Sequence, residues 1–281
     1  MTTQHSQIEL PDLRVLPVSS LLLHEQHDAQ RSERLAMRLN ADGVLRNPPI
    51  VAPVPGESRF VVLDGANRVT ALTSMGIPHV VAQVVEYEDD ELILDTWYHL
   101  VSDLPREDFH RAIDSLPGVS LVPSDLIGAR AELARREALA YLVYPNADVF
   151  TVKVDGDLHL RAARLNDIVD IYKTRGKIYR ANTDHVEKLL PYYDAVTALV
   201  VFPCYQPAEI IELARVGARL PAGIMRHVIP RRALRLNFPL SVLRDDWPLI
   251  EKNGYLKDWL KEKMSNKTAR FYQESTFLFD E

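Results

Sequence analysis

The sequence predicts a mixed α/β fold, in which a compact α/β lobe is followed by a closely packed α+β lobe. Short apolar runs bounded by turn residues alternate with segments of helical periodicity along the chain. The 281 residues are 47% hydrophobic and 26% charged, which is typical of a folded globular protein. We place a soft boundary near residue 90, between a first lobe of residues 1–90 and a second lobe of residues 91–281. Whether these are two intimately packed lobes or two separable domains stays open.

The first lobe contains a short alternation of strands and helices. Strands are predicted over residues 49–53, 59–63 and 80–86, and helices over residues 31–40 and 69–75, after an apolar run at residues 13–17. Gly43 and Gly76 follow the two predicted helices, as glycine often does at a helix end. The succession of strand, loop, helix and strand between residues 59 and 86 can bind phosphates, because the loop leads into the positive end of a helix.

The second lobe is predicted to mix helices and strands without an obvious core pattern of its own. Helices are expected within residues 105–141, in at least two pieces, and over residues 166–172, 184–193, 207–216 and 256–264. Strands are expected over residues 178–180, 198–202, 224–229 and 233–236. The turn Asp155-Gly156-Asp157 predicts a hairpin of two further strands, at residues 149–154 and 158–162.

Cys204 is the only cysteine, which excludes an intramolecular disulfide and a metal site with several cysteines. It follows an apolar run at residues 200–203, which predicts a buried strand and a small apolar role for the thiol. No stretch approaches the roughly 18 apolar residues of a membrane span. Residues 1–9 lack the basic and apolar regions of a secretory signal. We therefore expect a cytoplasmic protein without a membrane partner.

The net charge of −6 argues against a nucleic-acid partner. A domain that binds duplex DNA gathers Lys and Arg against the phosphates. The most basic segment, residues 226–235, has four arginines, a cluster that suits a phosphate or carboxylate on a small molecule. We expect a nucleotide and a small substrate as partners, and leave the oligomeric state open.

The block Asp64-Gly65-Ala66-Asn67-Arg68, directly after the strand at residues 59–63, is the stretch most suited to chemistry. Glycine lets the backbone approach a ligand closely, and the helix that follows turns unpaired N–H groups toward it. A phosphate there would be stabilised by these donors and by Arg68. Asp64 could hold a divalent cation between phosphates. A plain β-turn with a helix-capping aspartate remains an alternative.

The same block resembles a known superfamily, that of ParB and sulfiredoxin. An Asp-Gly-x-x-Arg block after an apolar strand, with Gly43-Val44-Leu45-Arg46-Asn47-Pro48 about twenty residues upstream, is typical of it. The resemblance sharpens to the free L-serine kinases of this fold, the type found in staphyloferrin B siderophore biosynthesis. The further segments that carry it are Leu16-Pro17-Val18, Leu23-His24-Glu25, Thr96-Trp97-Tyr98-His99, Leu220-Pro221-Ala222-Gly223-Ile224-Met225-Arg226, Arg232, Leu234 and Pro239-Leu240. They extend from about residue 14 to about residue 243.

This resemblance implies a kinase that transfers a phosphoryl group from ATP or ADP, with Mg²⁺, to the hydroxyl of free L-serine or a related amino acid. Glu25 matches the catalytic glutamate that takes the proton from the acceptor, and Asp64 is the second catalytic residue, as the Mg²⁺ ligand. The implied nucleotide-binding residues are Gly43, Arg46, Asn47, Pro48, Gly65, Ala66, Asn67 and Arg68. The implied substrate-binding residues in the acceptor site, which the second lobe completes, are Trp97, Met225, Arg226 and His227. Arg226 could clamp an amino-acid carboxylate.

Two positions depart from the family pattern. Asn67 stands where the family usually has histidine, and Met225 where it tends to have threonine, so a charge and a hydroxyl are lost. A changed acceptor, a protein that binds nucleotide without turnover, and a ParB-like regulator that contacts DNA or protein therefore remain open. Sulfiredoxin activity is excluded, because it needs a cysteine in the loop where Ala66 and Asn67 stand. The histidines show no spacing typical of a zinc site.

Overall fold

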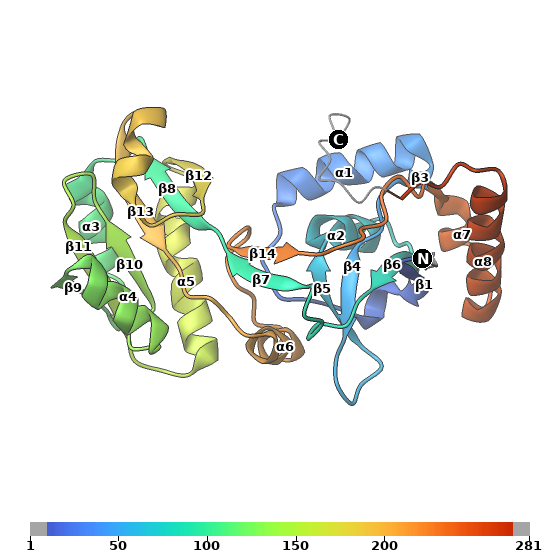
Figure 1. Ribbon diagram of the computed structural model, residues 1–281, viewed down its shortest axis with the longest axis horizontal. Helices are drawn as coiled ribbons and strands as arrows, with labels where there is room; N and C mark the ends of the chain where they lie inside the picture. Colours follow the sequence, from blue (N-terminus) through green and yellow to red (C-terminus); the bar gives the residue numbers. More distant parts are fainter. Residues whose placement is uncertain (1–9, 272–281) are drawn as a thin grey trace, which may run out of the picture.

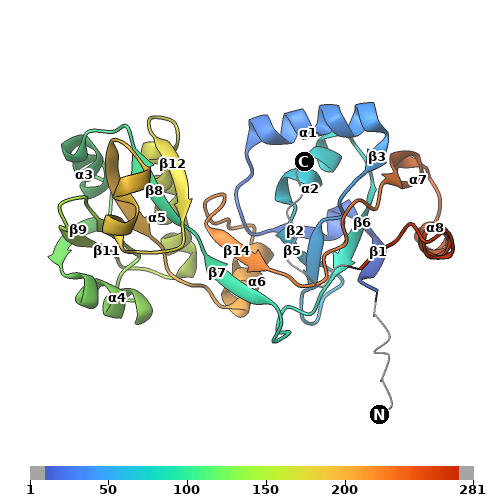
Figure 2. The ribbon, with the colours of Figure 1, turned by 45° about the horizontal axis from the view of Figure 1, so that its top comes forward.

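The computed structural model describes residues 10–271, which form two lobes joined by a two-stranded ribbon (Figures 1 and 2). Residues 1–9, the segment predicted not to be a secretory signal, lie outside the described residues, as do residues 272–281. The mixed α/β fold predicted from the sequence is confirmed. Among the described helices, none has the length and apolar character needed to cross a membrane.

The first lobe is built on a five-stranded mixed sheet. Its strand order is β1 (Asp12–Pro17), β6 (His79–Val84), β4 (Ile50–Pro53), β5 (Phe60–Asp64) and β2 (Leu21–Leu23), with a 3₁₀ turn at Val18–Ser20. Helices α1 (Ala29–Asp42) and α2 (Ala66–Ser74) pack against each other on this sheet (Figure 2). Both predicted helices are confirmed. Helix α2 begins at Ala66 rather than at residue 69, because Gly65 is its N-cap, so the predicted turn is shorter than expected.

The last part of the described chain returns to the first lobe. Strand β15 (Phe238–Pro239) pairs with β3 (Val44–Leu45), and helices α7 (Leu240–Arg244) and α8 (Leu249–Ser265) follow, with α8 beside β1 (Figure 1). Asn253 of α8 accepts a hydrogen bond from the backbone N–H of Val15 (2.9 Å) and donates one to its carbonyl (3.0 Å). Since β1 is an edge strand, these bonds satisfy main-chain groups that the sheet leaves unpaired. The helix predicted at residues 256–264 is confirmed and is longer, whereas the strand predicted at residues 233–236 does not form.

The second lobe is built on a six-stranded antiparallel sheet. Its strand order is β12 (Lys177–Ala181), β8 (Tyr98–Ser102), β13 (Val196–Val201), β10 (Ala140–Val143), β11 (Val149–Val154) and β9 (Val119–Ser124). Helices α3 (Arg106–Asp114) and α5 (Leu158–Lys173) share a core with one face, and α4 (Leu126–Ala134) shares a core with the other. The edge strand β12 of this sheet carries Arg180, whose charge acts on Glu25 of the candidate site.

Several predictions for the second lobe were wrong. The two helical pieces expected within residues 105–141 are confirmed as α3 and α4, but the segment between them forms β9, and residues 140–141 begin β10. Pro123 is tolerated in β9 because this strand is at the sheet edge. Residues 158–162 are not a hairpin strand but the start of α5, where the Asp157 side chain accepts a hydrogen bond from the N–H of Leu160 (2.9 Å) and caps the helix. Residues 184–193 form two short 3₁₀ helices, Val186–Lys188 and Leu190–Tyr192.

The ribbon between the lobes pairs β7 (Ile93–Thr96) with β14 (Met225–Val228), near helix α6 (Pro207–Arg215) (Figure 1). The segment before β14 also pairs with the segment that follows β2. The N–H of Gln26 donates to the Leu220 carbonyl and the N–H of Leu220 donates to the His24 carbonyl, both at 2.8 Å. These bonds place Glu25 next to the chain that enters the ribbon.

Candidate active site

Glu25 lies where the first lobe meets the segment that leads into β14. Its carboxylate accepts hydrogen bonds from the backbone N–H groups of Met225 (2.9 Å to Oε1) and Gly223 (3.4 Å to Oε2). Burial of the carboxylate raises the pKa of Glu25 to about 7, against the opposing effects of these two donors and of the Arg180 charge. The residue as a whole is only partly buried. A carboxylate with a near-neutral pKa, in a residue that is not wholly buried, has the properties of a general base.

Asp64 ends strand β5 and stands between two arginines. Its Oδ2 atom accepts from Arg68 (2.9 Å) and from Arg232. Burial acts to raise the pKa of Asp64, but the charges of Arg68 and Arg232 outweigh it and hold the pKa below the ordinary value. Asp64 is therefore ionised at neutral pH. Its charge in turn acts to raise the pKa of Glu25, so the two carboxylates share one electrostatic environment.

Arg68 brings the two predicted nucleotide-binding segments together. Its Nη1 donates to the carbonyls of Asn47 (2.9 Å) and Pro48 (2.7 Å), while its Nη2 binds Asp64. Gly65 is required at the start of the helix, because its φ is +99° and a Cβ there would stand 2.9 Å from the Cβ of Pro49. The end of β5, the start of α2 and residues 47–48 thus form one continuous surface.

The other predicted nucleotide-binding residues have defined places. Gly43 ends α1, and Arg46 pairs with Asp42 on the surface (3.0 Å). Ala66 is the first residue of α2. The Asn67 side chain is held by two hydrogen bonds. Its Oδ1 accepts from the N–H of Asp28 (3.1 Å) and from the hydroxyl of Ser32 (3.0 Å). Asn67 therefore ties the start of α2 to the start of α1.

The predicted acceptor-side residues lie on and beside the ribbon. The guanidinium of Arg226 stacks on Trp97, 4.4 Å from the ring centroid, and approaches Asp95 (3.4 Å). The side chain of Met225 is buried in the core, so this residue faces Glu25 through its backbone N–H. His227 contacts the hydroxyl of Tyr87 through Nε2 (2.9 Å), and burial lowers the pKa of His227 to about 4.

Sequence reasoning assigned no role to Arg180 or Tyr87, and named Arg232 only as part of the basic segment and of the family resemblance. Arg232 belongs to a segment that resembles the family, so its position beside Asp64 could have been anticipated. Tyr87 follows β6 and packs against His227. Arg180 has no local signal, because strand β12 carries it to Glu25 only through the tertiary fold. Within residues 10–271, no group of three or more His, Cys, Asp or Glu side chains could hold a metal ion.

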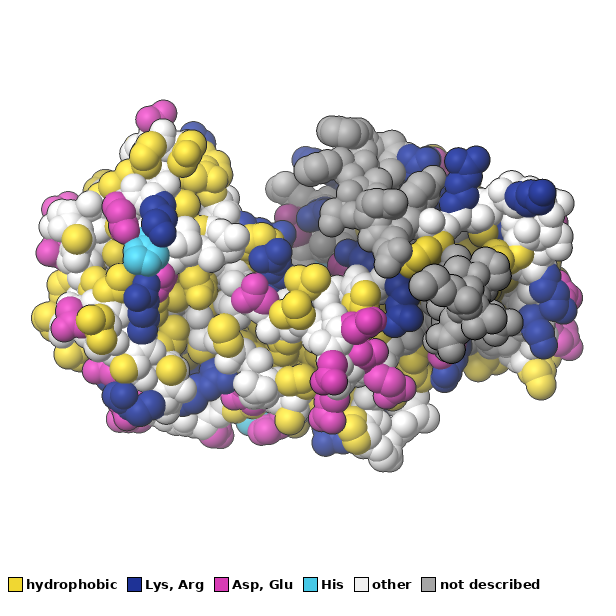
Figure 3. All heavy atoms as spheres, in the orientation of Figure 1, with side chains coloured by type: hydrophobic (Ala, Val, Ile, Leu, Met, Phe, Trp, Pro, Cys, Tyr) yellow, Lys and Arg dark blue, Asp and Glu magenta, His cyan; other side chains and the backbone are white. Residues whose placement is uncertain are grey.

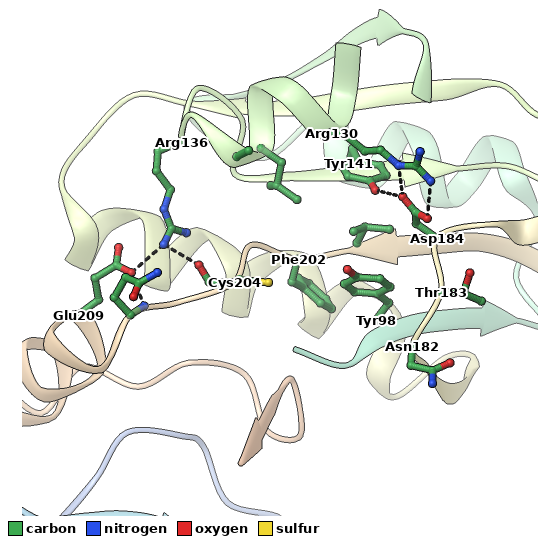
Figure 4. A pocket seen from close by; sticks show the side chains of 14 residues that line it. Tyr98, Arg130, Arg136, Tyr141, Asn182, Thr183, Asp184, Phe202, Cys204 and Glu209 are labelled. Atoms are coloured by element: carbon green, nitrogen blue, oxygen red, sulfur yellow. Dashed lines mark hydrogen bonds and ion pairs between the residues drawn. The ribbon is translucent and has the colours of Figure 1, made fainter. Parts of the chain in front are cut away.

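A separate cavity of about 680 Å³ lies in the second lobe (Figure 4). Arg130 and Asp184 form a doubly hydrogen-bonded pair in it (2.6 and 2.7 Å), and Arg136 binds Glu209 (2.7 Å). Cys204 lines it and is exposed, so the prediction of a buried thiol was wrong: β13 ends at Val201, before the cysteine. None of the predicted site residues lines this cavity.

The chain was compared with known proteins. No protein-family model matches it. The ATP-dependent L-serine kinase SbnI of Staphylococcus aureus is 25% identical over 280 residues, which cover 96% of this chain and 97% of the relative. The ADP-dependent L-serine kinase SerK of Thermococcus kodakarensis is 21% identical over 224 residues, 78% of this chain and 88% of the relative. An ATP-dependent L-serine kinase of Staphylothermus marinus is 34% identical over 84 residues, 30% of this chain and 33% of the relative.

Solved structures share the fold. A C-terminally truncated SbnI from Staphylococcus aureus has a TM-score of 0.71 at 21% identity, covering 90% of this chain and 97% of that chain. A free serine kinase in complex with AMP has a TM-score of 0.71 at 17% identity, covering 86% of this chain and 98% of that chain. The curated homologues of this chain are therefore L-serine kinases, and the resemblance that the sequence motifs indicated is confirmed.

Proposed function

We propose that this protein is a kinase that phosphorylates free L-serine or a closely related amino acid, with ATP or ADP as the phosphoryl donor. The observation that carries the proposal is the position of Glu25. The pKa of its carboxylate is near neutral. The carboxylate lies between Asp64, which pairs with two arginines, and the ribbon, beside which Arg226 stacks on Trp97. Curated relatives with this activity, one of them matching almost the whole chain, support the same conclusion.

The first lobe supplies the nucleotide side. The N-terminus of α2 offers unpaired N–H groups to phosphates, and Arg68 and Arg232 add positive charge beside them. The segment from Gly43 to Pro48 borders the same surface, because Arg68 holds its carbonyls. On the face shown in Figure 3, basic side chains are scattered among acidic ones, which suits a small anionic ligand better than a polymer track.

Asp64 fits a Mg²⁺ ion shared with the nucleotide. Mg²⁺ is commonly held by one or two carboxylates together with substrate phosphates, so a cage of protein ligands is not needed. Both ion pairs of Asp64 use Oδ2, and neither uses Oδ1. The lowered pKa keeps the carboxylate ionised, as a metal ligand must be. When bound there, Mg²⁺ would neutralise charge on the transferred phosphoryl group.

The second lobe and the ribbon supply the acceptor side. In the reaction with ATP, the serine hydroxyl oxygen bonds to the γ-phosphorus, and the bond from that phosphorus to the bridging oxygen breaks. The hydroxyl proton moves to Glu25, leaving ADP and O-phosphoserine. With ADP, the β-phosphoryl group moves and AMP leaves. Trp97, Arg226 and His227 border the acceptor, and Met225 holds the base through its N–H.

The test is to incubate the protein with Mg²⁺, ATP or ADP, and the twenty amino acids, and to record phosphorus NMR spectra. A new phosphomonoester that matches O-phosphoserine is the expected result, and Glu25→Gln is the matched control that should lose it. Nucleotide binding without any new phosphomonoester would favour a binding protein instead. Phosphorylation of another hydroxyl amino acid would identify a changed acceptor.

We place the reaction in the cytoplasm, where the nucleotide is available, and propose that the product supplies a specialised, siderophore-like biosynthetic pathway. Both proposals rest on the resemblance to the serine kinases. Growth of a deletion strain under iron limitation, with and without added O-phosphoserine, tests the second of them.

A further inference from the structure

Arg180 stands beside the proposed base but belongs to the other lobe. It lies on strand β12, opposite His99 of β8. Its charge acts to lower the pKa of both Glu25 and His99. Its Nη2 atom lies directly over Gly223, whose N–H points to Glu25. The second lobe thus places the guanidinium of Arg180 near the carboxylate of Glu25, which belongs to the first lobe.

Arg180 differs from the other arginines of the site in its partners. Arg68 and Arg232 bind Asp64, whereas Arg226 stacks on Trp97 and approaches Asp95. Within residues 10–271, the side chain of Arg180 has no hydrogen bond or ion pair, and the residue is exposed. A guanidinium held beside a reacting group without an anion of its own is suited to an anionic ligand, which it can bind through two parallel N–H bonds.

We propose that Arg180 binds the carboxylate of the acceptor amino acid. This inference rests on the proposed function, since it takes Glu25 as the base for the acceptor hydroxyl. In serine the hydroxyl and the carboxylate are attached to neighbouring carbon atoms. A molecule whose hydroxyl contacts Glu25 therefore places its carboxylate close by, on the side where the second lobe presents Arg180. The phosphates would be bound by Arg68 of the first lobe and by Arg232, which lies between β14 and β15 and pairs with Asp64.

Arg226, which sequence reasoning assigned to the carboxylate, is less suited to it. Its charge is already engaged by Asp95 and by the face of Trp97. We assign Arg226 to holding Trp97 in place, and Arg180 to recognition of the acceptor.

Gly223 makes the position of Arg180 possible. A Cβ at this residue would lie 2.5 Å from Nη2 of Arg180, so any other residue would displace the guanidinium. The glycine has a φ of +78°, which L-residues rarely adopt. The Pro221-Ala222-Gly223 turn therefore has two tasks: it donates an N–H to Glu25 and leaves room for the arginine.

The test compares Arg180→Gln with the wild-type protein on two acceptors, L-serine and ethanolamine, which has the hydroxyl and amine but no carboxylate. The KM for L-serine should rise about 10–150-fold, the loss of a hydrogen-bonded ion pair, with little change in kcat or in the KM for nucleotide. The constants for ethanolamine should be the same in both proteins. If ethanolamine is not turned over, its inhibition constant against L-serine replaces its KM. Lys177→Gln, on the same strand and paired with Asp103, is the matched control.

Three results would overturn the assignment. An equal loss with both acceptors, or a raised KM for nucleotide, would place Arg180 at the transferred phosphoryl group. Unchanged constants for L-serine would mean that Arg180 does not contact the acceptor. These results are distinct from failure of the proposed function, in which the wild-type protein itself forms no phosphoserine.

Discussion

The carboxylate of Glu25 accepts a hydrogen bond from the backbone N–H of Met225, 200 residues later in the chain, at 2.9 Å. The donor is a main-chain group, so its contact with the base does not depend on which side chain stands at position 225. A methionine in place of the family's threonine thus leaves the support of Glu25 intact. The departure from the family pattern at position 225 therefore does not affect the base.

Replacing Glu25 by Gln keeps its size and hydrogen-bonding reach but removes its ability to accept a proton. Base catalysis contributes about 10²–10⁴-fold, so we expect kcat to fall by that order. The loss should be at the lower end if the transition state is loose and the proton leaves late. Binding of nucleotide, measured by calorimetry, should change little. Full activity of the Gln variant would remove Glu25 from the mechanism.

The raised pKa of Glu25 predicts an acidic limb in the pH dependence of activity. The base must be ionised, so kcat/KM should rise with pH and be half-maximal near pH 7, where burial has moved the pKa. Asp64, with its lowered pKa, stays ionised throughout this range and adds no limb. The nucleotide also titrates near neutrality, so the residual activity of Glu25→Gln is the control. A wild-type profile that is flat from pH 5.5 to 8 would contradict the prediction.

The same pKa shift predicts that Glu25→Gln stabilises the fold at alkaline pH. In the unfolded chain Glu25 loses its proton near pH 4.5, whereas in the folded chain it keeps the proton up to about pH 7. Ionised Glu25 therefore costs folding free energy above pH 7, and this cost disappears below pH 4.5. Urea unfolding should show the variant more stable than wild type by about 1–3 kcal/mol at pH 8, and equally stable at pH 4. An equal difference at both pH values would point to packing instead.

Arg68→Ala should weaken nucleotide binding by about 1.5–3 kcal/mol, the loss of a hydrogen bond to a charged group. The free energy of unfolding should fall as well, because the carbonyls of Asn47 and Pro48 lose their hydrogen-bond donor. Arg59→Ala, a surface arginine of the same lobe paired with Glu57, is the control and should alter neither quantity by more than about 0.5 kcal/mol. Calorimetry on folded protein separates the two effects. Unchanged nucleotide affinity would exclude the loop from the site.

Salt should alter activity only weakly, and the protein should not bind DNA. A duplex-binding protein loses affinity steeply as salt rises, because counterions are released from the phosphates. Fluorescence anisotropy with a random duplex at physiological salt is the measurement. Sub-micromolar binding would favour a regulator of the ParB kind over a kinase.

The sequence predicts the first lobe well because its signals are local. The apolar run of β5, the glycine at 65 and the helix after it lie within a few residues of one another, and the structure has them together. The second lobe was predicted less well. Strand β9 contains Pro123 and is stabilised by pairing with β11, which no local pattern reveals. The start of α5 was mistaken for a strand because Asp155-Gly156-Asp157 fits a hairpin turn as well as a helix cap.

The candidate site divides in the same way. Asp64 and Arg68 are four residues apart, on either side of the start of α2, so their contact follows from the local sequence. Glu25 carries no local signal, and only the resemblance to a family pointed to it. Neither the local sequence nor the family resemblance pointed to Arg180. Its position near Glu25 depends on the pairing of β12 with β8 and on the turn at Gly223.

The return of the chain to the first lobe has a consequence for synthesis on the ribosome. Phe238 and Leu243 are fully buried in the same core as Leu45 and Val81, and α8 covers the edge of β1. When residues 10–90 have left the exit tunnel, the sheet is complete, but part of its apolar surface still lacks its cover. That surface stays exposed until the second lobe has been made and residues 236–265 have emerged. The first lobe is thus synthesised first, but its apolar core is completed last. Nascent chains stalled within the second lobe should therefore bind chaperones most strongly.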